Sequence, residues 1–188
     1  IVSTEDVEIA EISQRYGAEV PFLRPQELAG DDSPEWLTWQ HAIRILDSQA
    51  GEPKMEVFVC IPATSPLRSV EDVDACIRTL HDGDADLVIT VTETDRNPYY
   101  NMVALNGQGY AHVVVPTSRT IHRRQDAPHV YDMSTVAYAA RPEFIMSANS
   151  IFEGRVKAVV VPAERALDID TELDFKFAEF LLSQTSAH

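Results

Sequence analysis

The chain has 188 residues, of which 45% are hydrophobic and 24% charged, and its formal net charge is −15. This size and composition are typical of one folded domain with a sizeable core, and they exclude a disordered or fibrous protein. The acidic balance argues against nonspecific binding to nucleic acid or to anionic membranes, because the overall field repels polyanions. No apolar run reaches the roughly 20 residues of a membrane helix and no signal peptide is recognisable, so we expect a cytoplasmic protein.

The first third of the chain predicts two helices and a strand. Thr4 is expected to cap a helix that stops at Gly17. A strand is expected around Val20. Ser33 followed by Pro34 is typical of an N-cap with proline at the first helical position, which predicts a second helix. The apolar positions of these two helices are Val7, Ile9, Ile12 and Tyr16, and then Trp36, Trp39, Ala42, Ile43 and Leu46.

Buried strands alternate with a helix in the middle of the chain. Residues 57–61 form a continuous apolar run, the mark of a strand buried on both faces of a parallel sheet. Ser69 and Asp72 form a capping box for a helix with Val70, Val73, Ile77 and Leu80 inward. Residues 87–91 predict the next strand. This order indicates an α/β fold with a doubly wound, mostly parallel sheet, whose ligands lie beyond the carboxyl ends of the strands.

The second half predicts a β-hairpin, two more strands and a final helix. The Asn106-Gly107 pair between two apolar segments is typical of a hairpin that leaves the main sheet. Strands are expected at residues 136–139 and 158–161. Thr171 and Asp174 form another capping box, which opens the last helix. Cys60 and Cys76 have no Cys or His at metal-ligand spacing, so both are interpreted as buried thiols.

Asp168 and Asp170 could hold a metal ion. In an extended segment, carboxylates two residues apart project to the same side, about 7 Å from one another. Magnesium takes only one or two protein carboxylates and completes its octahedron with phosphate oxygens and water. The alternative is a pair of solvated loop acids, because Asp-x-Asp is a common pattern.

Two further segments carry groups suited to an anionic ligand. Thr64, Ser65 and Arg68 follow directly on the apolar strand, where an open sheet places its ligands. Arg123 and Arg124, followed by Gln125, supply local positive charge in an acidic chain, and arginine forks suit carboxylates and phosphates. A proline-containing connection and a solvated basic loop are the alternatives for these two segments.

Taken in order, these segments resemble the acylneuraminate cytidylyltransferases, the CMP-sialic acid synthetases. The matching blocks are residues 2–6 (VSTED), 18–25 (AEVPFLRP), 27–29 (ELA) with 31–34 (DDSP), 63–68 (ATSPLR) and 167–174 (LDIDTELD). The resemblance implies a Rossmann-like nucleotidyltransferase in which the anomeric hydroxyl of a nine-carbon acidic sugar attacks the α-phosphate of CTP and pyrophosphate leaves. It also implies a homodimer, with residues 97–155 as a hairpin excursion that serves dimerisation.

The resemblance assigns roles to individual residues. Asp168 and Asp170 correspond to the family's Mg²⁺ ligands. Arg24 and Ser33 fall in the segment around the cytidine. Arg124 corresponds to an arginine near the phosphates or the sugar. The resemblance places Tyr138 in the sugar pocket and Phe152 across the dimer interface.

The chain also departs from the family pattern. Pro62-Ala63 stands where the family has Gln-Pro, and Ser134-Thr135 stands where it has Asn-Gly, which makes a variant sugar such as a legionaminic-type nonulosonic acid plausible. The family begins with a strand and a glycine- and lysine-containing phosphate loop that this chain does not show, so we interpret residues 1–188 as a single domain lacking them. A ketodeoxyoctonate (Kdo) cytidylyltransferase and a catalytically inactive binding or oligomerisation module are the alternative functions.

Overall fold

The computed structural model describes residues 1–30, 32–49 and 54–185, so Asp31 of the matching blocks lies outside the described residues. The helices are α1 (Val7–Arg15), α2 (Glu35–Asp47), α3 (Val70–His81), α4 (Pro142–Ser147) and α5 (Glu172–Thr185). The strands are β1 (Phe58–Cys60), β2 (Leu87–Glu93), β3 (Val103–Leu105), β4 (Ala111–Val113), β5 (Tyr131–Ala140) and β6 (Val156–Val160). Four short 3₁₀ turns are η1 (Gln26–Leu28), η2 (Arg124–Asp126), η3 (Ile151–Glu153) and η4 (Ala163–Arg165).

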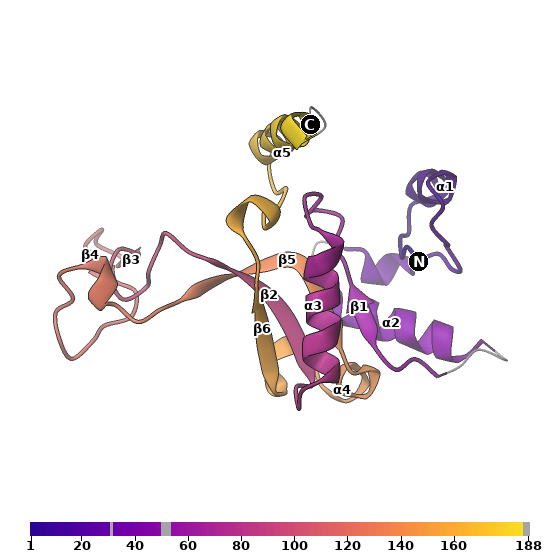
Figure 1. Ribbon diagram of the computed structural model, residues 1–188, viewed down its shortest axis with the longest axis horizontal. Helices are drawn as coiled ribbons and strands as arrows, with labels where there is room; N and C mark the ends of the chain where they lie inside the picture. Colours follow the sequence, from indigo (N-terminus) through magenta and orange to yellow (C-terminus); the bar gives the residue numbers. More distant parts are fainter. Residues whose placement is uncertain (31, 50–53, 186–188) are drawn as a thin grey trace. The chain divides into compact units, whose positions relative to one another are not determined.

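The main sheet has the strand order β1-β5-β2-β6 (Figure 1). β1 pairs with β5 in the antiparallel sense, with Val59 opposite Ala139. The N–H of Arg141 bonds the Asp86 carbonyl while Thr90 meets Ala137, so β2 also runs opposite to β5. β2 and β6 run parallel. Among the strands of this sheet β1, β2 and β6 therefore share one direction and β5 opposes them, so the sheet is mixed, which confirms the predicted α/β class.

The chain divides into two compact units. Unit 1 comprises residues 1–60, 77–88 and 138–157, and unit 2 comprises residues 61–76, 89–137 and 158–188. β2, β5, β6 and α3 each contribute residues to both units.

Unit 1 is built around the aromatic face of α2, as the helical pattern predicts. Trp36 and Trp39 are 7% and 4% exposed, and the Trp39 ring packs 5.3 Å from the ring of Tyr138. Trp36 donates its Nε1–H to the Ala148 carbonyl at 2.8 Å, so its one polar group is satisfied. Ser33 does not cap this helix, because Pro34 occupies the N-cap position and makes no side-chain cap bond.

Unit 2 contains a polar junction inside the sheet. The hydroxyl of Thr90 donates to the carbonyls of Ser134 and Ala137, and it accepts from the Ser134 hydroxyl and the Ala137 N–H. Thr90 and Ser134 are 0% and 5% exposed. Because both side-chain hydroxyls of this junction are hydrogen-bonded, it can lie in the core at little cost.

The separate hairpin of β3 and β4 pairs Val103 with Val113 and Leu105 with Ala111. Asn106 opens its turn and accepts from the N–H groups of Gln108 and Tyr110 through its side chain. Gly109, not Gly107, adopts the left-handed conformation, with φ of +84°.

Several local expectations were wrong. Asp6 rather than Thr4 caps α1, through bonds to Glu8 and Ile9, and the helix buries only Ala10. No strand forms near Val20 in the described residues, although the Val2 N–H donates to the Glu19 carbonyl and the Arg24 N–H donates to the Thr4 carbonyl, each at 2.8 Å. Val70 is 72% exposed, and the run at 57–61 is only half-buried in β1, with Ile61 outside the strand. Cys76 is buried but Cys60 is partly exposed.

Within the part of the chain that is described, no helix combines the length and apolar character needed to cross a membrane.

Candidate functional site

The structure brings the Asp168 segment against the Thr64 segment in unit 2. The Ile169 N–H donates to the Thr64 carbonyl at 2.9 Å, although the residues lie far apart in sequence. Both segments were predicted from sequence as parts of one site, and this bond brings them together.

The Asp168 carboxylate is the group in this segment best suited to a cation. Its Oδ1 oxygen is buried and accepts no hydrogen bond from any described residue. A buried carboxylate oxygen without a donor is costly unless a ligand compensates it. Asp170 is exposed, and its backbone N–H donates to Asp174 at 3.3 Å, which leaves its carboxylate outside the capping box.

Asp168 and Asp170 are two carboxylates that could hold magnesium. Over residues 1–30, 32–49 and 54–185, no cluster of three or more His, Cys, Asp or Glu side chains is arranged to hold a metal. Magnesium needs only one or two carboxylates when substrate phosphates and water supply the remaining oxygens.

The loop before α3 is fixed by hydroxyl contacts. Ser65 is fully buried, and its hydroxyl lies 2.6 Å from the hydroxyl of Thr135 on β5. Thr64 is exposed, so its hydroxyl is more accessible than that of Ser65. Arg68 is half-buried and donates to the Pro62 carbonyl. The contact between the buried Ser65 hydroxyl and the half-buried Thr135 hydroxyl therefore holds the loop in place, while Thr64 and Arg68 remain candidates for ligand contact.

An ion pair that the sequence did not predict stabilises the same region. Arg165 donates to both carboxylate oxygens of Asp72, each at 2.8 Å. Asp72 also accepts from the N–H and hydroxyl of Ser69, the predicted capping box. The Arg165 hydrogen bonds are the main reason that the pKa of Asp72 lies below its usual value. Nothing local in the sequence indicates this pair, because 93 residues separate its members.

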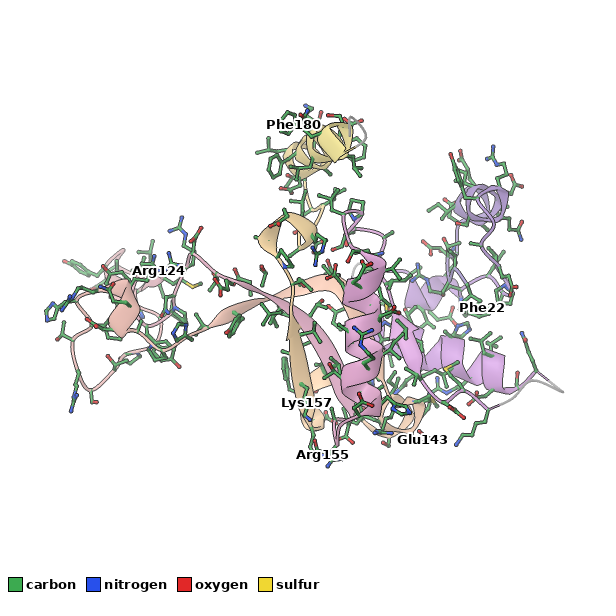
Figure 2. The ribbon with its side chains drawn as sticks, in the orientation of Figure 1. Phe22, Arg124, Glu143, Arg155, Lys157 and Phe180 are labelled. Carbon is green, nitrogen blue, oxygen red and sulfur yellow. The ribbon has the colours of Figure 1, made fainter. Side chains whose placement is uncertain are left out.

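Arg124 and Gln125 line a hollow of about 290 Å³ at the end of β2. Arg124 donates to the Thr94 carbonyl at 2.6 Å and to Asp95 at 3.1 Å, and it projects from η2 in the segment that carries β3 and β4 (Figure 2). Arg123 lies 3.5 Å from Asp126 and is largely exposed. The wall of the hollow also includes Glu93, Asn97, His129 and Tyr131.

Asn97 joins the two sides of this hollow. Its amide donates to the Pro128 carbonyl at 2.9 Å, its Oδ1 accepts from the Tyr99 N–H, and it is 7% exposed. Sequence reasoning missed this residue, although an Asn-Pro pair is a known turn signal.

Arg24 and Ser33, predicted near the cytidine, both lie in unit 1. Arg24 forms a 2.6 Å ion pair with Glu5. Its Nε and the Ser33 Oγ are buried atoms that have no hydrogen-bond partner among the described residues. The missing cap at Ser33 thus leaves a polar atom available to a ligand.

Tyr138 and Phe152 also belong to unit 1. Tyr138 is 4% exposed and packs on Trp39. Phe152 is 70% exposed and lines a hollow of about 290 Å³ with Trp36, Trp39 and Ile151. The predicted site residues therefore fall into two groups, one in each unit.

The fold resembles that of nucleotidyltransferases. The crystal structure of a CMP:2-keto-3-deoxy-manno-octonic acid synthetase with CTP matches 98% of this chain and 80% of its own, with a TM-score of 0.68 and 13% identity. A match at 13% identity shows a shared fold and nothing more. A scan of protein-family models finds no match.

Sequence relatives are more specific. The CMP-N,N′-diacetyllegionaminic acid synthase of Campylobacter jejuni is 32% identical over 183 residues, covering 97% of this chain and 76% of the relative. The Post-translational flagellin modification protein B of Campylobacter coli is 30% identical over 184 residues, covering 98% and 77%. The N-acylneuraminate cytidylyltransferase of Streptococcus agalactiae is 26% identical over 174 residues, covering 93% and 40%.

The sheet is Rossmann-like, as in the solved nucleotidyltransferase above, and the candidate ligand groups of residues 64–68 follow the end of β1. The sequence similarity to these relatives covers nearly the whole of this chain and is more specific than the likeness of the fold. The chain belongs to the CMP-sialic acid synthetase-like family of cytidylyltransferases.

Proposed function

We propose that this cytidylyltransferase transfers CMP from CTP to the anomeric hydroxyl of a nine-carbon acidic sugar. The anomeric oxygen forms a bond to the α-phosphorus as the bond to the bridging oxygen breaks. Pyrophosphate leaves with the electron pair, and the hydroxyl proton is released. The observation that carries the proposal is the buried Asp168 Oδ1 in a segment bonded to the Thr64 loop.

Asp168 and Asp170 would hold Mg²⁺, which when bound neutralises charge on the phosphates and the leaving group. The protein's part is to present two carboxylates from a segment whose backbone is fixed at Ile169. Arg24 Nε and Ser33 Oγ are the free polar atoms that would bind the cytidine.

Local charge supports an anionic substrate. The chain carries a net −15, yet the segment 94–131 is basic. Its charged residues, histidines aside, are Arg96, Arg119, Arg123 and Arg124 against Asp95 and Asp126. Such a patch concentrates positive potential where the whole molecule would repel an acid. The hollow lined by Arg124 and Gln125 is therefore the proposed position of the sugar carboxylate or the α-phosphate.

A legionaminic-type acid is the sugar we propose. The Campylobacter jejuni relative named for diacetyllegionaminic acid is 32% identical, against 26% for the Streptococcus agalactiae relative named for N-acylneuraminate and 25% for a Legionella pneumophila relative also named for diacetyllegionaminic acid. Ser134 and Thr135, which depart from the family pattern, are used inside the protein in bonds to Thr90 and Ser65. Because Thr135 contacts the Ser65 loop, we expect the changes at these positions to affect which sugar the site accepts.

Pyrophosphate release tests the proposal when CTP and Mg²⁺ are supplied with one sugar at a time. Diacetyllegionaminic acid should give the highest kcat/KM, and N-acetylneuraminic acid a lower one. A preference for Kdo would favour the alternative enzyme. An absence of turnover with every sugar would favour an inactive binding module.

We also propose that the enzyme acts as a homodimer. Phe152 is a large, 70% exposed aromatic beside the apolar hollow formed with Trp36 and Trp39. A second copy of the chain would cover it. Light scattering should give twice the monomer mass, and Phe152→Ser should shift the mass towards the monomer; a wild-type monomer would contradict the proposal.

A further inference from the structure

The Asp72–Arg165 ion pair lies outside the groups assigned to substrate or metal. Asp72 is 4% exposed at the first turn of α3, and Arg165 ends η4. The pair is bidentate, with both N–O distances at 2.8 Å. Among the ion pairs of the described residues it has the most buried carboxylate.

The connection from β6 to α5 is held at a small number of points. The Val161 N–H bonds the Val91 carbonyl at 2.8 Å, and the Ile169 N–H bonds the Thr64 carbonyl at 2.9 Å. Between Val161 and Ile169, the Arg165 side chain forms the ion pair with Asp72, three residues before Asp168. Arg165 and Ile169 therefore bracket the carboxylate that carries the unpartnered oxygen.

We infer that the Asp72–Arg165 pair positions Asp168 for the metal ion, an inference that rests on the proposed function. Arg165 is a positioning residue, since its guanidinium is engaged by both carboxylate oxygens of Asp72. Its planar fork fixes the orientation of η4 in a way that a single ammonium group cannot. Because Ser69 also binds Asp72, the pair ties the metal-binding segment to the N-terminus of α3 and to the end of the Thr64 loop.

Arg155 offers a matched control. It binds Asp86 through Nε and NH2, both at 3.2 Å, at the other end of β6 and within unit 1 (Figure 2). The Arg155–Asp86 pair is bidentate like the Arg165–Asp72 pair, but Arg155 is not bonded to the Asp168 segment. The change Arg155→Lys thus removes the same type of contact at a different place.

The test measures Mn²⁺ binding in the presence of CTP by electron paramagnetic resonance on the full chain. Arg165→Lys should raise the Kd for Mn²⁺ about tenfold, the lower end of the range for residues that support metal ligands. Arg155→Lys should leave that Kd unchanged. Circular dichroism and thermal unfolding should show both variants folded, and Asp72→Asn, which keeps the size of the side chain, should repeat the Arg165 effect.

Equal Mn²⁺ affinity in Arg165→Lys and the wild type, or equal weakening in both lysine variants, would overturn the inference. Failure of the proposed function gives a different result: wild-type protein would then bind no Mn²⁺ with CTP and release no pyrophosphate with any sugar.

Discussion

The backbone N–H of Ile169 lies 2.9 Å from the carbonyl oxygen of Thr64. This bond fixes the residue between Asp168 and Asp170 against the loop that follows β1. It therefore determines where the two carboxylates stand relative to the hydroxyls and guanidinium of residues 64–68. The first prediction depends on this relationship.

Asp168→Asn and Asp170→Asn should each abolish CMP transfer while leaving the fold intact. The carboxylates are expected to hold the cation that neutralises the leaving pyrophosphate, and an amide holds it poorly. Steady-state turnover at saturating Mg²⁺, together with circular dichroism, checks this. Asp174→Asn is the control: Asp174 caps α5 through Thr171, so its loss should lower the melting temperature and leave the chemistry unaffected. Wild-type turnover in either of the first two variants would refute the metal assignment.

Arg124→Ala should lower kcat/KM by roughly tenfold to a hundredfold, because an arginine that binds an anion is worth about 1.5–3 kcal/mol. Arg155→Ala should act mainly on stability, since Arg155 is engaged with Asp84 and Asp86. Kinetics with varied sugar and varied CTP will show which substrate is affected. Equal losses of kcat/KM in the two variants would contradict the assignment of Arg124, rather than Arg155, to substrate binding.

The Asp72–Arg165 pair predicts a pH dependence of stability. The hydrogen bonds from Arg165 hold the pKa of Asp72 below its usual 3.8, so the folded state binds the proton less readily than the unfolded chain. The pair therefore stabilises the protein above about pH 4, and this contribution is lost as pH falls through the lowered pKa. Asp72→Asn should cost about 1–3 kcal/mol near pH 7, because Arg165 is partly exposed and the pair is screened.

Urea unfolding of the wild type and of Asp72→Asn between pH 7 and pH 3 measures this effect. The difference in unfolding free energy should shrink on acidification. A difference that stays constant across the range would mean that the carboxylate charge does not stabilise the fold.

Gly154→Ala should destabilise the protein by about 1–3 kcal/mol through overpacking. A Cβ at this position would lie 2.5 Å from Cε2 and 2.7 Å from Cζ of the Phe144 ring. Gly107→Ala is the control, since no atom lies within 4 Å of its Cβ and its φ is not in the left-handed region. Chemical denaturation of both variants checks the prediction, and equal stabilities would contradict it.

The features that the sequence predicted well are local. The capping boxes of Ser69 with Asp72 and of Thr171 with Asp174 span three residues, and each appears in the structure. The buried face of α2 follows from helical spacing and was confirmed at Trp36 and Trp39.

The features that could not be predicted depend on contacts between distant residues. Arg165 binds Asp72 across 93 positions, and Asn97 binds Pro128 across 31. Helix spacing alone could not show that α1 leaves Val7 and Ile9 exposed, because exposure depends on which element packs against the helix. The metal ligands were assigned by resemblance, and the structure adds the unpartnered Asp168 Oδ1, which no sequence pattern reports.

Mass spectrometry of the reaction product tests the central claim most directly. The full chain is incubated with CTP, Mg²⁺ and diacetyllegionaminic acid, and the products are separated and weighed. The proposed function predicts a CMP-linked nonulosonic acid and pyrophosphate in equal amounts, both absent when Asp168 is replaced by Asn. Release of pyrophosphate without a CMP-sugar, or a CMP-sugar formed equally well by Asp168→Asn, would contradict it.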